Sequence, residues 1–169
     1  SMSGDAESGT STFTMKGGTL TGRNGDQIYV TNTHSVITLE DVTITNQDSS
    51  GRLLAILGND ATRGWGTAGA NGGQVDLTTT NQTLTGAIEV DTVSTLNFTM
   101  GKGTNFTGTI NIVKNAEGGT AVDNNAVITV EEGATWTLTG NVTITSLENK
   151  GTINFNGYTI TLADGTVLK

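Results

Sequence analysis

The sequence predicts an all-β fold, a parallel β-solenoid of about six coils with three short strands in each coil. Residues 126–168 show the pattern best, because they repeat one phrase twice: three short strands of alternating apolar and polar residues, separated by turns rich in Gly and Asn. Four earlier copies of this phrase precede it, and Pro, which cannot donate a ladder hydrogen bond, is absent. Repeats this short must stack to bury their apolar residues. Hairpins or a sandwich are the alternative, but their Asn-Gly or Asp-Gly turns would be more frequent and more evenly spaced.

The strands follow the same order in every coil. From the first strand to the third, the spacing varies only from 13 to 17 residues, whereas successive coils are 21 to 38 residues apart. The variation in length therefore follows the third strand, and two long insertions are expected there, at residues 58–73 and 113–125. The first strands are expected to begin at Phe13, Ile37, Val75, Leu96, Ile128 and Ile153, and the inward residues of the third strands at Ile28, Leu54, Ile88, Ile110, Val142 and Val167.

One axial core should collect the inward apolar residues of all the coils. Trp136 has the inward phase of its strand, so we expect it in this core with its indole N–H reaching a turn carbonyl. The other expected core residues are Phe13, Met15, Leu20, Ile28, Ile37, Leu39, Ile44, Leu77, Leu84, Ile88, Leu96, Phe98, Phe106, Ile110, Ile128, Val130, Leu138, Val142, Ile153, Phe155 and Ile160.

The composition limits the classes of function. At 169 residues and 17.4 kDa the chain has the length of one domain, and we expect residues 1–11 to be a tag scar and polar linker and residues 12–169 to be a single β-helix domain, a fragment of a larger surface protein. A net charge of −8 argues against nucleic acid or an anionic membrane as a partner. The sequence contains no run of about eighteen apolar residues, so we expect no segment to insert into a membrane.

The two insertions are the candidate binding site. Because they follow third strands two coils apart, we expect them to rise at one corner about 10 Å apart, with a groove between them. Carboxylates, a guanidinium group and an indole ring suit a sugar, whose ring face stacks on Trp. Trp65 could instead only fasten its loop to the solenoid. The expected ligand-binding residues are Asp60, Arg63, Trp65, Glu89, Asp91, Thr92, Asn111 and Asp123.

The sequence favours a protein that is not an enzyme and has no cofactor. His34 is the only His, Cys is absent and no Gly-x-Ser-x-Gly occurs, so the usual nucleophilic arrangements have no signal. His34 follows residues 32–33 at the insertion corner, where it could contact a ligand, but it is interpreted as a surface turn residue. Residues 123–125 (DNN) could offer oxygens to Ca²⁺ but lack the spacing of a calcium loop. The outward ladder expected for the first strands contains only one carboxylate, so it offers no cluster of acidic groups for catalysis. Its residues are Thr14, Thr38, Asp76, Asn97, Thr129 and Asn154.

Threonine flanks the inward residue of nearly every predicted second strand. Stacked coils would place these residues in two ranks on one face, the arrangement expected of an ice-binding protein, although Thr is also the default outward residue of a strand. The expected ranks are Thr19/Thr21, Thr43/Thr45, Thr83/Thr85, Asn105/Thr107, Thr137/Thr139 and Thr159/Thr161.

Several segments resemble known bacterial surface proteins. Residues 135–144 (TWTLTGNVTI) followed by 151–155 (GTINF) resemble the tail of β-helical passenger domains of autotransporter-type adhesins. This resemblance implies a right-handed helix and an extracellular location, secreted or on the bacterial surface; it transfers no catalytic residue. The middle of the chain looks like β-helical carbohydrate-binding or adhesin-like domains through residues 65–66 (WG), 71–73 (NGG), 82–86 (QTLTG) and 91–96 (DTVSTL).

The function expected from the sequence is therefore adhesion or glycan binding by a non-catalytic module. Its partner would be a host or environmental glycan or a surface protein, and the chain would be a monomer or stack end to end with neighbouring coils of a parent protein. Two alternatives stay open: a passive structural stalk and an ice-binding protein. Long insertions favour binding over a stalk, because binding surfaces of repeat proteins are often built from them.

Overall fold

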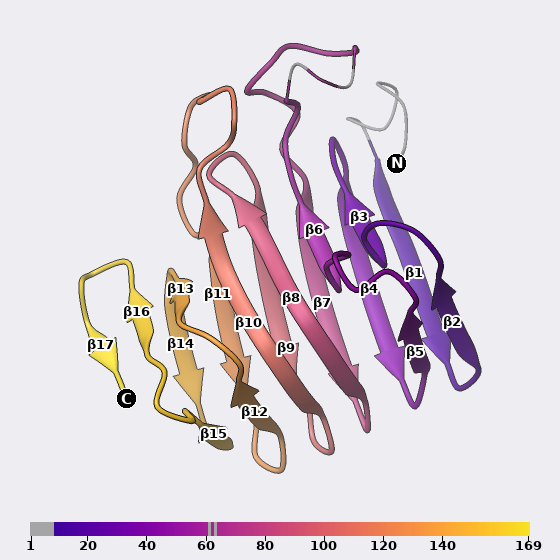
Figure 1. Ribbon diagram of the computed structural model, residues 1–169, viewed down its shortest axis with the longest axis vertical. Coiled ribbons are helices and arrows are strands. Elements are labelled where there is room, and N and C mark those ends of the chain that lie inside the picture. Colours follow the sequence, from indigo (N-terminus) through magenta and orange to yellow (C-terminus); the bar gives the residue numbers. More distant parts are fainter. Residues whose placement is uncertain (1–8, 61, 63) are drawn as a thin grey trace.

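The computed structural model describes residues 9–60, 62 and 64–169, and in this part of the chain the fold is all-β with mainly parallel sheets (Figure 1). The strands are β1 (Thr10–Lys16), β2 (Thr19–Gly22), β3 (Ile28–Val30), β4 (His34–Glu40), β5 (Thr43–Asn46), β6 (Leu54–Ile56), β7 (Gln74–Thr80), β8 (Thr83–Asp91), β9 (Thr95–Met100), β10 (Asn105–Val113), β11 (Ala126–Val130), β12 (Thr135–Leu138), β13 (Val142–Ile144), β14 (Ser146–Asn149), β15 (Thr152–Asn154), β16 (Ile160–Leu162) and β17 (Val167–Leu168).

The chain passes repeatedly between two sheets, whose strands are parallel except for the last pair, β16 and β17. The first sheet has the order β1-β4-β7-β9-β11-β14, and the second has the order β17-β16-β13-β10-β8-β6-β3, with β12 and β15 attached through β10. A separate pair, β2-β5, precedes β8 along the same side. We call each passage from one strand of the first sheet to the next a round, so that β1–β3 is round one and β14–β17 is round six. Each round pairs with the following one, so the core runs along the stack.

Alternation along each strand places the apolar residues in that core. Phe98 and Trp136 are 0% exposed and Phe106 is 1% exposed, and their rings form a continuous series across three strands: the centroids of Phe98 and Phe106 are 6.1 Å apart and those of Phe106 and Trp136 are 5.8 Å apart. The indole N–H of Trp136 donates to the carbonyl oxygen of Gly108 at 3.1 Å. The sequence-based prediction for Trp136 is thus confirmed.

Two glycines let the nine-residue strands β8 and β10 pass close together. Gly86 in β8 has a φ of 127°, a value that side chains rarely allow, and it pairs in register with Gly108 in β10. A Cβ atom on Gly108 would lie 1.9 Å from the carbonyl oxygen of Gly86. Glycine is therefore required at position 108.

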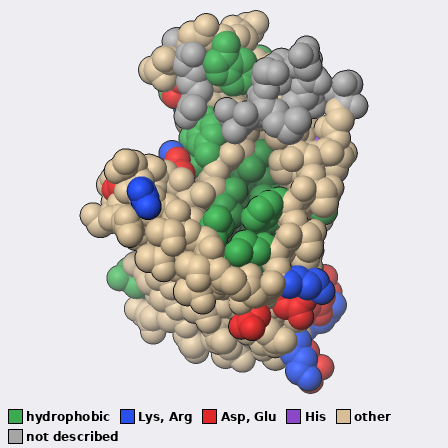
Figure 2. All heavy atoms as spheres, turned by 90° about the vertical axis from the view of Figure 1, so that its right-hand side faces the viewer, with side chains coloured by type: hydrophobic (Ala, Val, Ile, Leu, Met, Phe, Trp, Pro, Cys, Tyr) green, Lys and Arg blue, Asp and Glu red, His purple; other side chains and the backbone are tan. Residues whose placement is uncertain are grey.

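The first round leaves part of the core uncovered, and the prediction for Phe13 is wrong. Phe13 is 43% exposed, because among the described residues β1 pairs only with β4. Figure 2 shows apolar side chains in the hollow at this end of the molecule. The hollow has a volume of about 310 Å³, and Phe13, Leu20, Ile28 and Tyr29 are among its lining residues.

Most other predicted core residues are buried, and the rest pack against the core. The partly buried ones lie near the two ends of the stack or beside the gap between β5 and β8: Met15, Leu20, Ile28, Ile44, Ile153 and Phe155. The fully buried ones are Ile37, Leu39, Leu77, Leu84, Ile88, Leu96, Phe98, Phe106, Ile110, Ile128, Val130, Leu138, Val142 and Ile160.

The last round differs from the prediction by one strand. The strand predicted to be its first, at Ile153, is β15 and lies in the second position, because β14 pairs with β11. The predicted third strand at Val167 is β17, which turns back at residues 163–166 and pairs with β16 in the antiparallel sense. Val167 is 53% exposed. The Asp164 side chain closes this turn by accepting the Thr166 N–H at 2.8 Å.

The register of the first sheet also differs from the prediction. Thr38 pairs with Thr78, and Thr78 pairs with Thr99, whereas Asp76 pairs with Val36. A shift by two residues keeps the alternation of apolar and polar side chains, so the hydrophobic pattern alone could not detect it. The outward ladder is therefore Thr14, Thr38, Thr78, Thr99 and Thr129, with Glu148 at its end.

Candidate functional site

The two insertions converge over round three. They follow β6 and β10 and lie at the same edge of the molecule, at the top of Figure 1. They meet at Gly69 and Gly119, where a Cβ atom on Gly119 would lie 2.0 Å from the carbonyl oxygen of Gly69. The wide groove predicted between them is thus replaced by a contact. A hollow of about 150 Å³ remains beside it, and its lining includes Asp60, Asp91 and Lys114.

Asp91 holds the bases of both insertions and does not form an open floor. It is 2% exposed, and its Oδ2 accepts hydrogen bonds from the Gly58 N–H and from the Asn115 side-chain amide, each at 2.7 Å. Its Oδ1 accepts the Val93 N–H at 3.3 Å. Thr92 accepts the Asn115 N–H through its hydroxyl at 3.1 Å. The prediction that Asp91 contacts a ligand therefore requires correction: its carboxylate is sealed by these bonds.

Glu89 and Asn111 also have partners within the protein. Glu89 forms an ion pair with Arg52, and Asn111 connects β10 with β13 by accepting the Thr143 N–H at 2.8 Å and donating to the Asn141 carbonyl at 3.3 Å. Both side chains therefore join neighbouring rounds. Neither the pairing of Glu89 with Arg52, 37 residues away, nor the register of β10 and β13 could be read from local sequence patterns.

The other residues predicted to bind a ligand do not lie together in one site. Asp60 is partly exposed and accepts a hydrogen bond from the Thr62 hydroxyl. Trp65 is partly buried, and its carbonyl oxygen accepts a bond from the Asn59 side chain, so its loop is folded on itself. Arg63 lies outside the described residues. Asp123 is exposed and lies on a different surface, described below.

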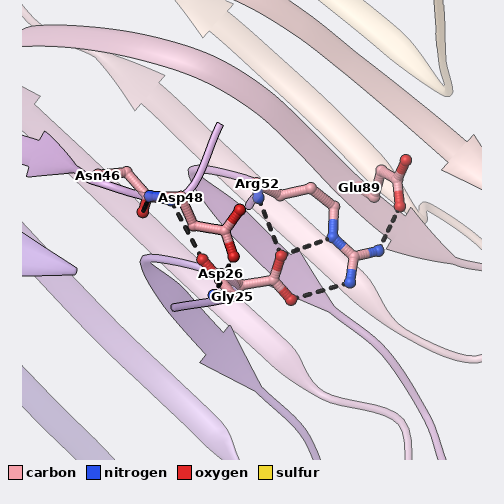
Figure 3. A network of polar contacts seen from close by, with 6 residues as sticks. All are labelled: Gly25, Asp26, Asn46, Asp48, Arg52 and Glu89. Carbon is pink, nitrogen blue, oxygen red and sulfur yellow. Dashed lines mark hydrogen bonds and ion pairs between the residues drawn. The ribbon is translucent and has the colours of Figure 1, made fainter. Parts of the chain in front are cut away.

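Arg52 links three successive rounds (Figure 3). Its Nε and Nη2 donate to the two carboxylate oxygens of Asp26 at 2.9 and 2.8 Å, and its Nη1 contacts Glu89. These hydrogen bonds, first of all those to Asp26, raise the pKa of Arg52 above its ordinary value. Beside them, Ser50 and the Gly25 N–H donate to Asp48 and lower the pKa of its carboxyl to about 2.

Replacing Arg52 by Ala should lower the free energy of unfolding by about 1–3 kcal/mol, because Asp26 and Glu89 lose their shared cation. The loss of stability should stay below that for breaking a fully buried ion pair, because the Arg52 side chain is 29% exposed and solvent screens its charge. Urea denaturation followed by circular dichroism measures the change. Arg23→Ala, at an exposed position, is the matched control and should be nearly neutral; equal effects of the two substitutions would contradict the assignment.

A polar groove runs over the outer side of the first sheet. It consists of two hollows, of about 380 and 510 Å³, that share His34 and Gln74. We call it the His34 groove. Its lining residues come from β1, β4, β7, β9 and β11, from the turn before β4 and from both insertions. The residues that line it are Gly9, Thr10, Asn32, Thr33, His34, Gly72, Gln74, Val75, Asp76, Thr95, Leu96, Asn97, Asp123, Asn124 and Val127.

His34 lies in the middle of this groove at the start of β4, rather than in the surface turn that the sequence suggested. Its Nε2 is 2.8 Å from Oδ2 of Asp76, and because a carboxylate only accepts, Nε2 donates in this bond. Its Nδ1 lies 3.5 Å from the Thr10 hydroxyl. The His34 and Asp76 side chains are 39% and 47% exposed, so a ligand can reach both.

Pairing between distant strands creates this arrangement, which sequence reasoning missed. Gln74 and His34 are partners in the register of β4 and β7, and Asp76 lies two residues further along β7, on the same face. The available signal was the single His at the start of a strand, but its acidic partner is 42 residues away.

Comparisons with protein-family models, curated proteins and solved structures found no match. Within residues 9–60, 62 and 64–169, no group of three or more His, Asp or Glu side chains is placed to hold a metal ion. In the DNN segment at residues 123–125, the side chain of Asn125 donates to the carbonyl oxygen of Ser94 at 2.8 Å. The same described ranges contain no helix that is long and apolar enough to cross a bilayer.

Proposed function

We propose that this protein is a non-catalytic module that binds glycans through the His34 groove. The groove is the observation that carries the proposal, because it extends over strands of five successive rounds and so suits a long chain better than a compact molecule. Its hydroxyl, amide, imidazole and carboxylate groups supply both donors and acceptors for sugar hydroxyls. The half-exposed His34 and Asp76 would form the central contacts.

We infer further that the rounds form a right-handed parallel β-helix. Each strand of the first sheet pairs in parallel with the strand of the next round, and a crossover between parallel strands of one sheet is right-handed in nearly all proteins. This architecture and the resemblance to adhesin passenger domains favour a secreted or surface-attached bacterial protein that takes part in adhesion. A passive stalk is the alternative; the built polar groove favours binding.

A glycan array with the intact chain, followed by affinity electrophoresis, tests the proposed function. His34→Ala and Asp76→Ala should each weaken binding about tenfold, equivalent to about 1.4 kcal/mol. Glu132→Ala removes a carboxylate at an exposed turn away from the groove and is the matched control. If the array finds no glycan, or if all three variants bind equally, the proposal is wrong and a passive stalk becomes the better account.

A further inference from the structure

Ordered ranks of threonine cover the face formed by β2, β5, β12 and β15 and by the first halves of β8 and β10. We call it the threonine face. Two positions in each strand flank the inward residue, and ten of these twelve positions are Thr and two are Asn. The positions are Thr19/Thr21, Thr43/Thr45, Thr83/Thr85, Asn105/Thr107, Thr135/Thr137 and Thr152/Asn154. The pairs predicted for the last two rounds, Thr137/Thr139 and Thr159/Thr161, are corrected by the register.

The ranks are in register over most of this face. Thr85 pairs with Thr107, and Thr107 pairs with Thr137, in neighbouring strands. Between β5 and β8 the ladder is interrupted, and the buried side chain of Gln82 replaces it by bonding to both the N–H and the carbonyl of Val42, at 2.9 and 2.7 Å. A hollow of about 240 Å³ opens there. The continuous part of the threonine face therefore runs from β8 to β15.

Threonine content alone does not distinguish this face, because the outward ladder of the first sheet also has five Thr in six positions. The absence of charge does distinguish it, since Lys16, Glu40 and Asp76 lie on the outer side of the first sheet. The face formed by β3, β6, β13, β16 and the second halves of β8 and β10 serves as an internal comparison, since it belongs to the same rounds and shares β8 and β10 with the threonine face. Its outward row contains two Thr in six positions, and it includes a charged residue, whereas none of the twelve positions on the threonine face is charged. This row is Tyr29, Ala55, Glu89, Asn111, Thr143 and Thr161.

We propose that the threonine face binds ice. Alternate residues of a strand are about 6.7 Å apart and neighbouring strands about 4.8 Å apart, so the Thr side chains form a two-dimensional lattice with spacings close to those of oxygen atoms on an ice surface. Each Thr offers a methyl group, which orders adjacent water, and a hydroxyl group, which hydrogen-bonds to it. The absence of charges and aromatic rings from the twelve positions fits ice better than a crystalline polysaccharide. The His34 groove is on another sheet, so this function is independent of glycan binding.

Thermal hysteresis and the partition of the intact chain into growing ice test this proposal. The protein should shape ice crystals and produce a gap between melting and freezing. Thr107→Tyr, in the middle of the continuous ranks, should abolish most of that gap, and Thr85→Lys, at an exposed position, should do so even if the first variant folds poorly. Thr143→Tyr, exposed on the control face, should keep full activity.

Several results would overturn the proposal. The proposal is wrong if the wild-type chain does not shape ice at millimolar concentration. It is also wrong if Thr143→Tyr reduces the activity as much as Thr107→Tyr. The wild-type chain could bind microcrystalline cellulose or chitin without any ice activity, and Thr107→Tyr could lose that binding. This pair of results would assign the face to a crystalline glycan instead. Melting curves by circular dichroism establish that each variant compared is folded.

Discussion

Replacing Trp136 by Ala is expected to lower the free energy of unfolding by about 3–5 kcal/mol. The side chain is fully buried, and it stacks on Phe106 with an angle of 21° between the ring planes. Its removal leaves a cavity in the middle of the stack, and the carbonyl of Gly108 loses the indole donor. Neither loss can be repaired locally, because Phe106 is itself held between Phe98 and Trp136. Urea denaturation followed by far-ultraviolet circular dichroism measures the effect.

Trp136→Phe separates the two contributions. It keeps an aromatic ring beside Phe106 and removes the N–H, so a smaller loss of about 1–3 kcal/mol is expected from the unsatisfied carbonyl and the reduced ring. If Trp136→Ala cost less than about 1 kcal/mol, the ring could not be central to the core.

Replacing Asp91 by Ala is expected to cost about 2–4 kcal/mol, because two buried donors, the Gly58 N–H and the Asn115 side-chain amide, lose their acceptor. The damage should concentrate in the two insertions, whose bases Asp91 joins. Limited proteolysis should therefore cut residues 58–73 and 113–125 faster in the variant, while the strands keep their circular dichroism. Melting curves give the accompanying loss of stability.

Asp123→Ala is the control for this experiment. It removes a carboxylate from the second insertion at an exposed position, so it should change stability by less than about 0.5 kcal/mol and leave the proteolysis pattern unchanged. Equal cleavage of the Asp91 and Asp123 variants would show that the insertions do not depend on the buried carboxylate.

The sequence was informative where periodicity determines position. Alternation identified the inward residues of the central rounds, such as Ile88 and Phe98, and the aromatic size and phase of Trp136 were enough to place it in the core. The same signal failed at the ends. It cannot tell that, among the described residues, β1 pairs only with β4 and so leaves Phe13 exposed, or that the chain reverses direction before Val167.

The candidate site was harder to predict for a different reason. The predicted residues were chosen because the insertions follow corresponding strands, but Gly-rich loops have no periodicity that reveals their contacts, and Gly69 and Gly119 close the expected groove. Asp91 was predicted to form the floor of that groove, but it is buried, and its carboxylate accepts a hydrogen bond from the side chain of Asn115, 24 residues away. The hydrogen bond between His34 and Asp76 depends on the register of β4 and β7. Alternation cannot fix that register, because a shift by two residues keeps the same side chains inward.

The unequal ends of the stack give the molecule a direction. The antiparallel pair β16–β17 closes the last round, whereas in the part of the chain that the structure describes no strand pairs with the outer edge of β1, and Phe13 is half-exposed. In a linear array each repeat is held by its neighbours, so the repeat with one neighbour and a poorly covered interior has the lowest local stability. Thermal unfolding should thus start in round one and proceed toward round six. The ion pairs of Arg52 with Asp26 and Glu89 connect rounds one to three, so they should be the first interactions that oppose this unfolding.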